Sequence, residues 1–243
     1  MPYIKETYTY AGGVEIRKYY SSRYGQKDAK RGTCRAPTKE EMERINERNA
    51  AKQLRRLIET NFTCGDYHVV LTYRKADRPN AKEAIKRRDN FLRKLRRAYK
   101  AVDGGLRYIS VIEKEARSIH HHLIVNACDP QIIQKAWEWG NTHITMLYDA
   151  GRYEDLAAYL IKETRRTFRE KNRIQGKRWT ASRNLRQPDV KKEIVKAYAW
   201  REKPSVPKGY ILDPDSVRTG CHSVTGYAYQ EYRIIKITDR KKE

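Results

Sequence analysis

Three consecutive histidines, His120 to His122, are half of the six histidines in this 243-residue chain. They lie in the segment 118–126, SIHHHLIVN, whose apolar run predicts a β-strand. Because side chains alternate along a strand, His120 and His122 would share one face, and His121 would point to the other. Two imidazoles on one face of a strand can ligate one divalent ion.

A metal site needs a third ligand, and Glu113 is the first candidate. Glu113 ends one predicted strand and His120 begins the next after six residues, which predicts an antiparallel hairpin. The hairpin would bring two nitrogens and a carboxylate together with open positions, a set that suits Mn²⁺ or Mg²⁺ better than structural zinc. Glu115 is the rival third ligand, and a His-rich strand without metal is the alternative interpretation. His143, on a later strand, is expected at an edge or in the core.

A candidate nucleophile lies in the segment AAYLIKETRR. On a helix, Tyr159 and Lys162 are neighbours at i and i+3, and Arg166 extends the same face. A phenol, with an ordinary pKa of about 10, is a poor nucleophile unless a cation or metal stabilises its anion. The chain has 18 tyrosines, most of which serve packing or stacking, and Tyr153 on the same helix is a rival.

The charge balance indicates a polyanionic partner. Fifty-three Lys and Arg against thirty Asp and Glu leave a net charge of +23, which favours nucleic acid first and an anionic membrane second. No apolar run approaches the roughly 18 residues of a membrane span. The segment KRRDNFLRKLRRAYK predicts a basic helix that tracks phosphates, with a solvated face as the alternative. The residues expected to contact DNA are Lys86, Arg87, Arg93, Arg96, Arg97, Arg165, Arg166 and Arg183.

Four cysteines stand far apart without a C-x-x-C spacing, which argues against a zinc site or a disulfide framework and favours a reducing, cytoplasmic setting. Hydrophobic residues make up 39% and charged residues 34% of the chain, so we expect a core over part of its length.

Hydrophobic periodicity predicts an α+β fold. A helix begins at a capping box, Thr38 with Glu41. The pattern then reads strand, helix, strand, strand, helix, strand, helix, and its first six elements are typical of a ferredoxin-like βαββαβ core whose antiparallel sheet has the first and third strands in the centre. The expected strands are 65–73, 106–113, 120–126 and 141–148, and the expected helices are 81–101, 129–140 and 152–170.

The ends of the chain are less regular. The first 36 residues have no clear period and are interpreted as an arm. After the core, a short helix is expected at 189–200 and a strand at 229–237. The predicted organisation is therefore an N-terminal arm and helix (1–62), a catalytic domain (63–172), and a C-terminal extension (173–243) that binds DNA or adds a sheet edge.

These motifs resemble the HUH endonucleases, the metal-dependent nickases that start rolling-circle replication. IHHHLIV is similar to their His-hydrophobic-His strand, with His121 departing from the usual apolar residue. VVLTY resembles their first motif and YLIK their Tyr-x-x-Lys helix, with Tyr159 as nucleophile. Glu113 corresponds to the third ligand of replication initiators. The resemblance covers about residues 37–190, where the context, including ASRNLRQP, is similar to phage and plasmid replication-associated proteins.

The resemblance implies a single-tyrosine transesterase acting on single-stranded DNA at an origin hairpin. Tyr159 would form a 5′-phosphotyrosine and leave a free 3′-OH, an ion held by Glu113, His120 and His122 would polarise the phosphate, and Lys162 would neutralise charge. Such a protein works in a bacterial cytoplasm with host helicase and DNA polymerase, as a monomer or as a dimer. Alternatives are a transposase- or relaxase-like nickase and a non-catalytic RNA-binding module of the RRM type.

Overall fold

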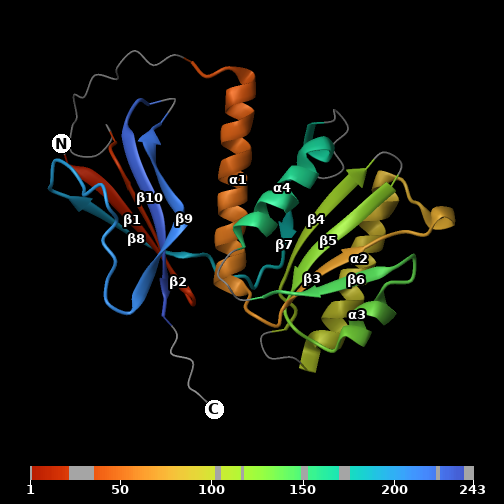
Figure 1. Cartoon of the computed structure of the whole chain (residues 1–243). Coiled ribbons are helices and arrows are strands. Elements are labelled where there is room, and N and C mark those ends of the chain that lie inside the picture. The colour runs from red at the N-terminus through yellow and green to blue at the C-terminus, as the bar shows by residue number, and fades with distance from the viewer. Residues whose placement is uncertain are drawn as a thin grey trace. The chain divides into compact units, whose positions relative to one another are not determined.

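The computed structural model describes residues 2–21, 36–101, 105–115, 118–148, 153–169, 176–222 and 225–237. The chain forms two compact units, Glu47–Arg186, and Met1–Asn46 together with Gln187–Glu243 (Figure 1). Among the described residues, no helix combines the length and the apolar character needed to cross a membrane.

The unit Glu47–Arg186 is built on a five-stranded antiparallel sheet in the order β6-β3-β5-β4-β7. In the part β6-β3-β5-β4 of this order, the two central strands are β3 and β5. They are the first and third strands of the βαββαβ pattern, which confirms the ferredoxin-like prediction. The strand bounds are β3 Tyr67–Leu71, β4 Tyr108–Glu115, β5 Ser118–Val125, β6 Thr142–Met146 and β7 Thr180–Ala181.

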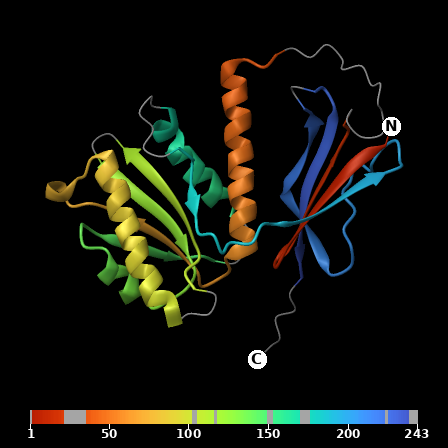
Figure 2. The same cartoon turned by 180° about the vertical axis from the view of Figure 1, so that it is seen from behind.

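Helices cover both faces of this sheet. Seen from behind in Figure 2, α2 (yellow) crosses in front of the strands, and α3 packs against it. The opposite face is covered by α4 and by the part of α1 from Glu47 onward. The helix bounds are α1 Lys39–Asn61, α2 Ala81–Ala98, α3 Pro130–Ala136 and α4 Glu154–Arg169, with short 3₁₀ turns η1 at Lys75–Asp77 and η2 at Tyr99–Ala101.

Polar side chains cap the helix starts, as the sequence predicts. Thr38 and Glu41 exchange two backbone-to-side-chain hydrogen bonds of 2.8 and 3.2 Å at the start of α1, so the capping box is confirmed. The Asn80 side chain accepts from the Glu83 N–H ahead of α2, and Asp129 accepts from Gln131 ahead of α3.

Strand alternation divides the apolar side chains between two cores. On the α2 and α3 side, Val69, Leu71 and Leu123 pack with residues such as Leu95. On the α4 side, Ile124 packs in a cluster that includes Ile109, Val111, Leu160 of α4 and Leu54 of α1. Successive residues of β5 therefore face different layers, which decides where its three histidines point.

The segment after α4 returns to the sheet and is fixed there by polar groups. The Ser182 N–H donates to the Tyr108 carbonyl, and the Ser182 hydroxyl accepts from the Tyr108 N–H at 3.0 Å. Asn61 and Arg186 are joined by two side-chain-to-backbone hydrogen bonds of 2.8 Å. The ASRNLR motif thus holds the chain against β4, next to the short edge strand β7.

The second unit corrects two predictions about the chain ends. Residues 3–19, interpreted as part of an arm, form the hairpin β1–β2, and the helix expected at 189–200 is wrong because 189–195 is the strand β8. The expected last strand is confirmed as β10. The bounds are β1 Tyr3–Tyr10, β2 Gly13–Tyr19, β8 Asp189–Val195, β9 Tyr210–Cys221 and β10 Ala228–Lys236, in the sheet order β8-β1-β2-β10-β9.

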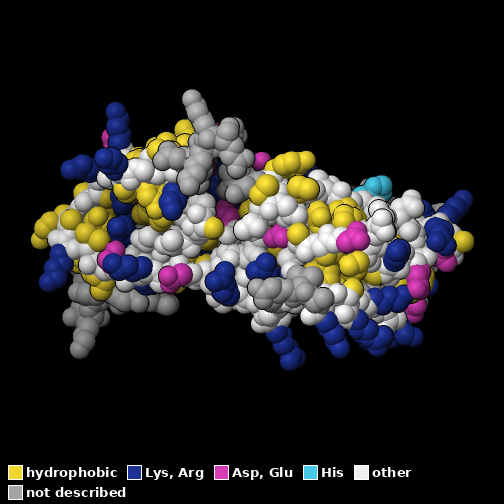
Figure 3. All heavy atoms as spheres, turned by 90° about the horizontal axis from the view of Figure 1, so that it is seen from below, with side chains coloured by type: hydrophobic (Ala, Val, Ile, Leu, Met, Phe, Trp, Pro, Cys, Tyr) yellow, Lys and Arg dark blue, Asp and Glu magenta, His cyan; other side chains and the backbone are white. Residues whose placement is uncertain are grey.

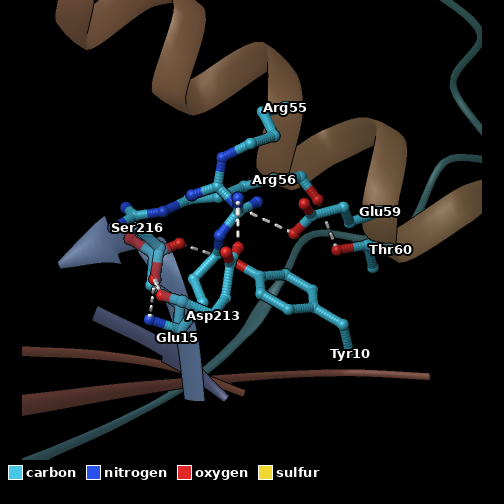
Figure 4. A network of polar contacts seen from close by, with 9 residues as sticks. Tyr10, Glu15, Arg55, Arg56, Glu59, Thr60, Asp213 and Ser216 are labelled. Carbon is cyan, nitrogen blue, oxygen red and sulfur yellow. Dashed lines mark hydrogen bonds and ion pairs between the residues drawn. The ribbon is translucent and has the colours of Figure 1, made fainter. Parts of the chain in front are cut away.

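Contacts at strand ends and within β9 show how this sheet is held together. A Cβ on Gly13 would lie 2.3 Å from the Ile234 carbonyl oxygen, so the close approach of β2 and β10 requires glycine. Tyr10 donates to Glu15 across the hairpin, and Ser216 donates to the Asp213 carbonyl within β9 (Figure 4). N-terminal and C-terminal residues therefore build one sheet, rather than two separate extensions.

Candidate active site

The β4–β5 hairpin brings Glu113 and the histidine pair together. Glu113 is the direct cross-strand partner of His120, and the side chains of both share a face with His122. The Oε2 atom of Glu113 lies 2.7 Å from His122 Nε2 and 3.7 Å from His120 Nδ1. Glu113 and His122 are buried, whereas His120 is half-buried. The side chain of Glu115, the rival ligand, lies outside the described residues.

His121 points to the opposite layer, as strand alternation predicts. Its Nε2 atom is hydrogen-bonded to the Tyr73 hydroxyl at 2.7 Å, and its ring lies edge-on to Trp137. Burial lowers the pKa of His121 to about 3, so the imidazole is neutral. The polar residue at this normally apolar position is thus accommodated by a hydrogen bond in the α2-side core, with β5 in the expected register.

Helix α4 places Tyr159 against His122, one of the two histidines of the pair. The ring of Tyr159 stands edge-on to His122, with centroids 5.6 Å apart and an interplanar angle of 78°. Tyr159 remains 43% exposed, and Lys162, one turn further along α4, is also exposed. Tyr153 is only 6% exposed and belongs to the core cluster beneath α4. Of the two tyrosines, only Tyr159 combines access to solvent with contact to a histidine of the pair.

The carboxyl group of Glu113 has a strongly depressed pKa. Hydrogen bonds from His120 and His122 are the main cause and outweigh the opposing effect of burial. Glu163 of α4 is also within hydrogen-bond reach of Glu113. Sequence reasoning missed Glu163, although its position four residues after Tyr159 places it on the same helix face.

His68 of β3 is a second residue that the sequence reasoning missed. Its Nε2 atom lies 3.4 Å from His122 Nδ1, and the two rings are nearly parallel, with centroids 5.6 Å apart and an interplanar angle of 14°. Burial, with a smaller contribution from His122, lowers the pKa of His68 to about 4. His68 lies two residues before Val70, the cross-strand partner of His122, so it shares a sheet face with His122, and this pairing is known only from the folded sheet.

The donor types at this site, one carboxylate and two imidazoles, are those that bind divalent ions. Two atoms bound to one ion at about 2.0–2.2 Å lie within roughly 4.4 Å of each other, and Glu113 Oε2 meets this condition with both histidine nitrogens. Among the described residues, no group of three or more His, Cys, Asp or Glu side chains is arranged so that it could hold a metal ion. Glu113 Oε2 is bonded directly to His122 Nε2, and an ion bound between these two atoms would have to replace that bond.

His143 does not join this group of donors. It is exposed on β6, at the edge of the sheet, and β3 separates it from β5. The edge position is one of the two that the sequence allowed. His143 therefore provides a histidine on the same sheet that lies outside the candidate ligand set.

The predicted DNA contacts fall into two groups. Those on α2 lie on the sheet face opposite to Tyr159, and Lys86, Arg93, Arg96 and Arg97 are exposed there. Arg87 instead bonds Glu83 at 3.1 Å and lies over the Trp139 ring. In Figure 3, Lys and Arg side chains (dark blue) gather at the lower right, within the unit that carries α2.

The remaining predicted contacts lie on or after α4. Arg165 is exposed and donates to Glu47 of α1 at 2.8 Å. Arg183 is exposed after β7. The side chain of Arg166 lies outside the described residues. The α2 residues therefore form a basic surface on the sheet face opposite to the candidate site. Arg165 lies on α4, and Arg183 follows β7.

One family model matches the chain, and it covers residues 66–164 with the description "Replication-associated protein ORF2/G2P". The match begins immediately before β3 and ends within α4, so it includes Glu113, His120, His122 and Tyr159. The resemblance to rolling-circle replication proteins is confirmed for this segment. No curated protein and no solved structure matches the chain.

Proposed function

From the match of residues 66–164 to the replication-associated protein ORF2/G2P family, we propose that this protein is a rolling-circle replication initiator that nicks single-stranded DNA through Tyr159. The observation that carries the proposal is the position of Tyr159. It is the accessible tyrosine beside His122, on the face where Glu113 and His120 also lie.

In the proposed reaction, the Tyr159 oxygen attacks the scissile phosphorus. The new O–P bond forms as the bond from phosphorus to the 3′-oxygen breaks, and the proton released by the phenol is balanced by the one that the 3′-oxygen takes up. Because one phosphate ester replaces another, the reaction is reversible, and the 3′-OH can prime synthesis or attack the phosphotyrosine to rejoin the strand.

The surrounding side chains bind and orient the reacting groups. Glu113, His120 and His122 would hold a divalent ion such as Mn²⁺ or Mg²⁺, which when bound supplies Lewis-acid polarisation of the phosphate. Lys162, exposed one turn after Tyr159, would supply a positive charge to the phenolate and the phosphate. The depressed pKa of Glu113 keeps its carboxylate ionised at neutral pH and available as a ligand.

The burial of Tyr153 supports the single-tyrosine type of initiator. A second strand-transfer step would then use another subunit or an activated water, rather than Tyr153. We further propose that origin hairpin DNA is the substrate and that host helicase and DNA polymerase extend the nicked strand in a bacterial cytoplasm. A transposase- or relaxase-like nickase would use the same site for a different purpose.

The test is cleavage of end-labelled single-stranded oligonucleotides that tile the DNA around the protein's own gene, with Mn²⁺ or with EDTA. We expect cleavage at a single position, dependent on metal, and lost in Tyr159→Phe. The Tyr153→Phe variant is the matched control and should cleave like the wild type. Binding without cleavage at any tiled position would instead favour a non-catalytic nucleic-acid-binding module.

A further inference from the structure

Histidine 122 contacts two side chains through its two ring nitrogens. Nε2 faces the Glu113 carboxylate at 2.7 Å, and Nδ1 faces His68 Nε2 at 3.4 Å. His122 is 3% exposed, so water reaches neither nitrogen readily. The position of the ring hydrogen on His122 is therefore set by these two neighbours.

The contact with Glu113 fixes one tautomer. An ionised carboxylate only accepts hydrogen bonds, so a neutral His122 must carry its hydrogen on Nε2 and accept at Nδ1. His68 then donates from its Nε2–H. This tautomer cannot ligate an ion through Nε2, because a ligating nitrogen needs a free lone pair.

Ligation reverses both roles. When Nε2 of His122 is a ligand, the ring hydrogen lies on Nδ1, and a partner there must accept it. Side chains that accept this second hydrogen bond orient the ligating imidazole and fix its tautomer. Among the described contacts of His122 Nδ1, His68 Nε2 is the one placed to do so, and an imidazole is able both to donate and to accept.

We propose that His68 is a positioning residue that sets the tautomer of His122, donating to Nδ1 when His122 bonds Glu113 and accepting from Nδ1 when His122 binds a divalent ion. The proposal rests on the metal site of the proposed function and adds a residue from a third strand to it. The proton between the rings passes from His68 Nε2 to His122 Nδ1, one proton leaves His122 Nε2, and one enters His68 Nδ1 from solvent, so both imidazoles stay neutral.

The geometry distinguishes substitutions that look equally conservative. The contact is made by the far nitrogen of His68, and the amide of a glutamine reaches about as far as Nε2, whereas the amide of an asparagine reaches only about as far as Nδ1. His68→Gln should therefore keep a group that can donate and accept at the right place. His68→Asn and His68→Leu should not.

The experiment is a titration of the full-length protein with Mn²⁺, in which free Mn²⁺ is followed by electron paramagnetic resonance without DNA. Wild type, His68→Gln, His68→Asn and His68→Leu are compared, with His122→Ala as the reference for loss of the site. Circular dichroism of the metal-free proteins checks that each variant is folded. We expect His68→Leu and His68→Asn to bind Mn²⁺ about 10- to 100-fold more weakly than wild type, the range typical of residues that support a ligand.

Recovery by His68→Gln to within a fewfold of wild type, without recovery by His68→Leu, would support the tautomer role, since leucine fills a similar space and packing alone would not separate the two. Equal Mn²⁺ affinity in wild type and folded His68→Leu would overturn the proposal while leaving the metal site intact. Equal weakening in all three His68 variants would also overturn it. If wild type and His122→Ala bind Mn²⁺ alike, the proposed metal site itself fails, and the role of His68 fails with it.

Discussion

The ring of Tyr159 lies edge-on to the imidazole of His122, with 5.6 Å between centroids. The two residues come from α4 and β5, which are separated in sequence by α3 and β6. The packing of α4 on the sheet therefore creates the pairing of a phenol with a possible metal ligand. Substitutions at this site and in the core that maintains it can test this arrangement.

The first prediction concerns the two kinds of histidine on the sheet. His122→Ala removes a proposed ligand and should reduce metal-dependent nicking at least about 100-fold. His143→Ala is the matched control, because His143 is exposed on the edge strand β6, and it should retain nicking within about twofold. Initial rates on one labelled oligonucleotide give the comparison. Similar losses in both variants would argue against His122 as a ligand.

The second prediction concerns the buried pair Tyr73 and His121. Tyr73→Phe leaves the buried His121 Nε2 without its hydrogen-bond partner, which should lower the free energy of unfolding by about 1–3 kcal/mol. In the double variant Tyr73→Phe/His121→Leu the polar atom is gone, so the cost should be smaller than the sum of the single costs. Urea unfolding gives the free energy of unfolding of wild type, of the single variants Tyr73→Phe and His121→Leu, and of the double variant. Additivity within about 0.5 kcal/mol would mean that the two residues are not coupled.

The third prediction concerns stability at alkaline pH. Burial raises the pKa of Tyr99, whose hydroxyl donates to the Asn126 carbonyl at 2.7 Å. In the unfolded chain Tyr99 loses its proton above a pH of about 10, whereas in the folded protein it keeps its proton. The contribution of Tyr99 to the free energy of unfolding is therefore fully present below a pH of about 10. It decreases as the pH rises, by up to about 1.4 kcal/mol per pH unit. In Tyr99→Phe, the free energy of unfolding should decrease less steeply than in wild type between about pH 10 and 11.

The control for this measurement is Tyr198→Phe, because Tyr198 is 84% exposed. Its unfolding midpoint should follow the wild-type dependence on pH. If Tyr99→Phe and Tyr198→Phe both behave like wild type across this range, ionisation of Tyr99 does not limit alkaline stability.

The fourth prediction separates DNA binding from chemistry. The exposed basic residues of α2 lie on the opposite side of the sheet from Tyr159. Replacing Arg93, Arg96 and Arg97 with Ala should weaken binding to long single strands and reduce the slope of log K against log salt by about 0.7 for each phosphate that is no longer neutralised. Nicking of a saturating short oligonucleotide should be unchanged. An unchanged salt slope would show that α2 does not bind phosphate.

The central βαββαβ pattern could be predicted because its signals are local. Asn80 and Asp129 mark helix starts, and the short connection between β4 and β5 restricts Glu113 and His120 to neighbouring strands. The sequence therefore predicted the core of the candidate site. The direction of His121 also followed from strand alternation alone.

The parts that were missed depend on distant pairings. In the sheet of the second unit, Thr7 pairs with Lys191, and polar segments on both strands carry no strong period of their own. The charged segment 189–195 is compatible with a helix until β1 is present to pair with it. His68 and Glu163 were missed for the same reason, since only the folded sheet and α4 bring them to His122 and Glu113.

The most direct test of Tyr159 as the nucleophile is peptide mapping by mass spectrometry. The protein is first incubated with Mn²⁺ and the intact oligonucleotide that it cleaves. We expect the 5′-phosphorylated DNA fragment to be attached to Tyr159 and no adduct to form in Tyr159→Phe, as the assignment of Tyr159 as the nucleophile requires. An adduct on Tyr153 or on another tyrosine, or cleavage that leaves a free 5′-phosphate with no adduct at any time, would contradict it.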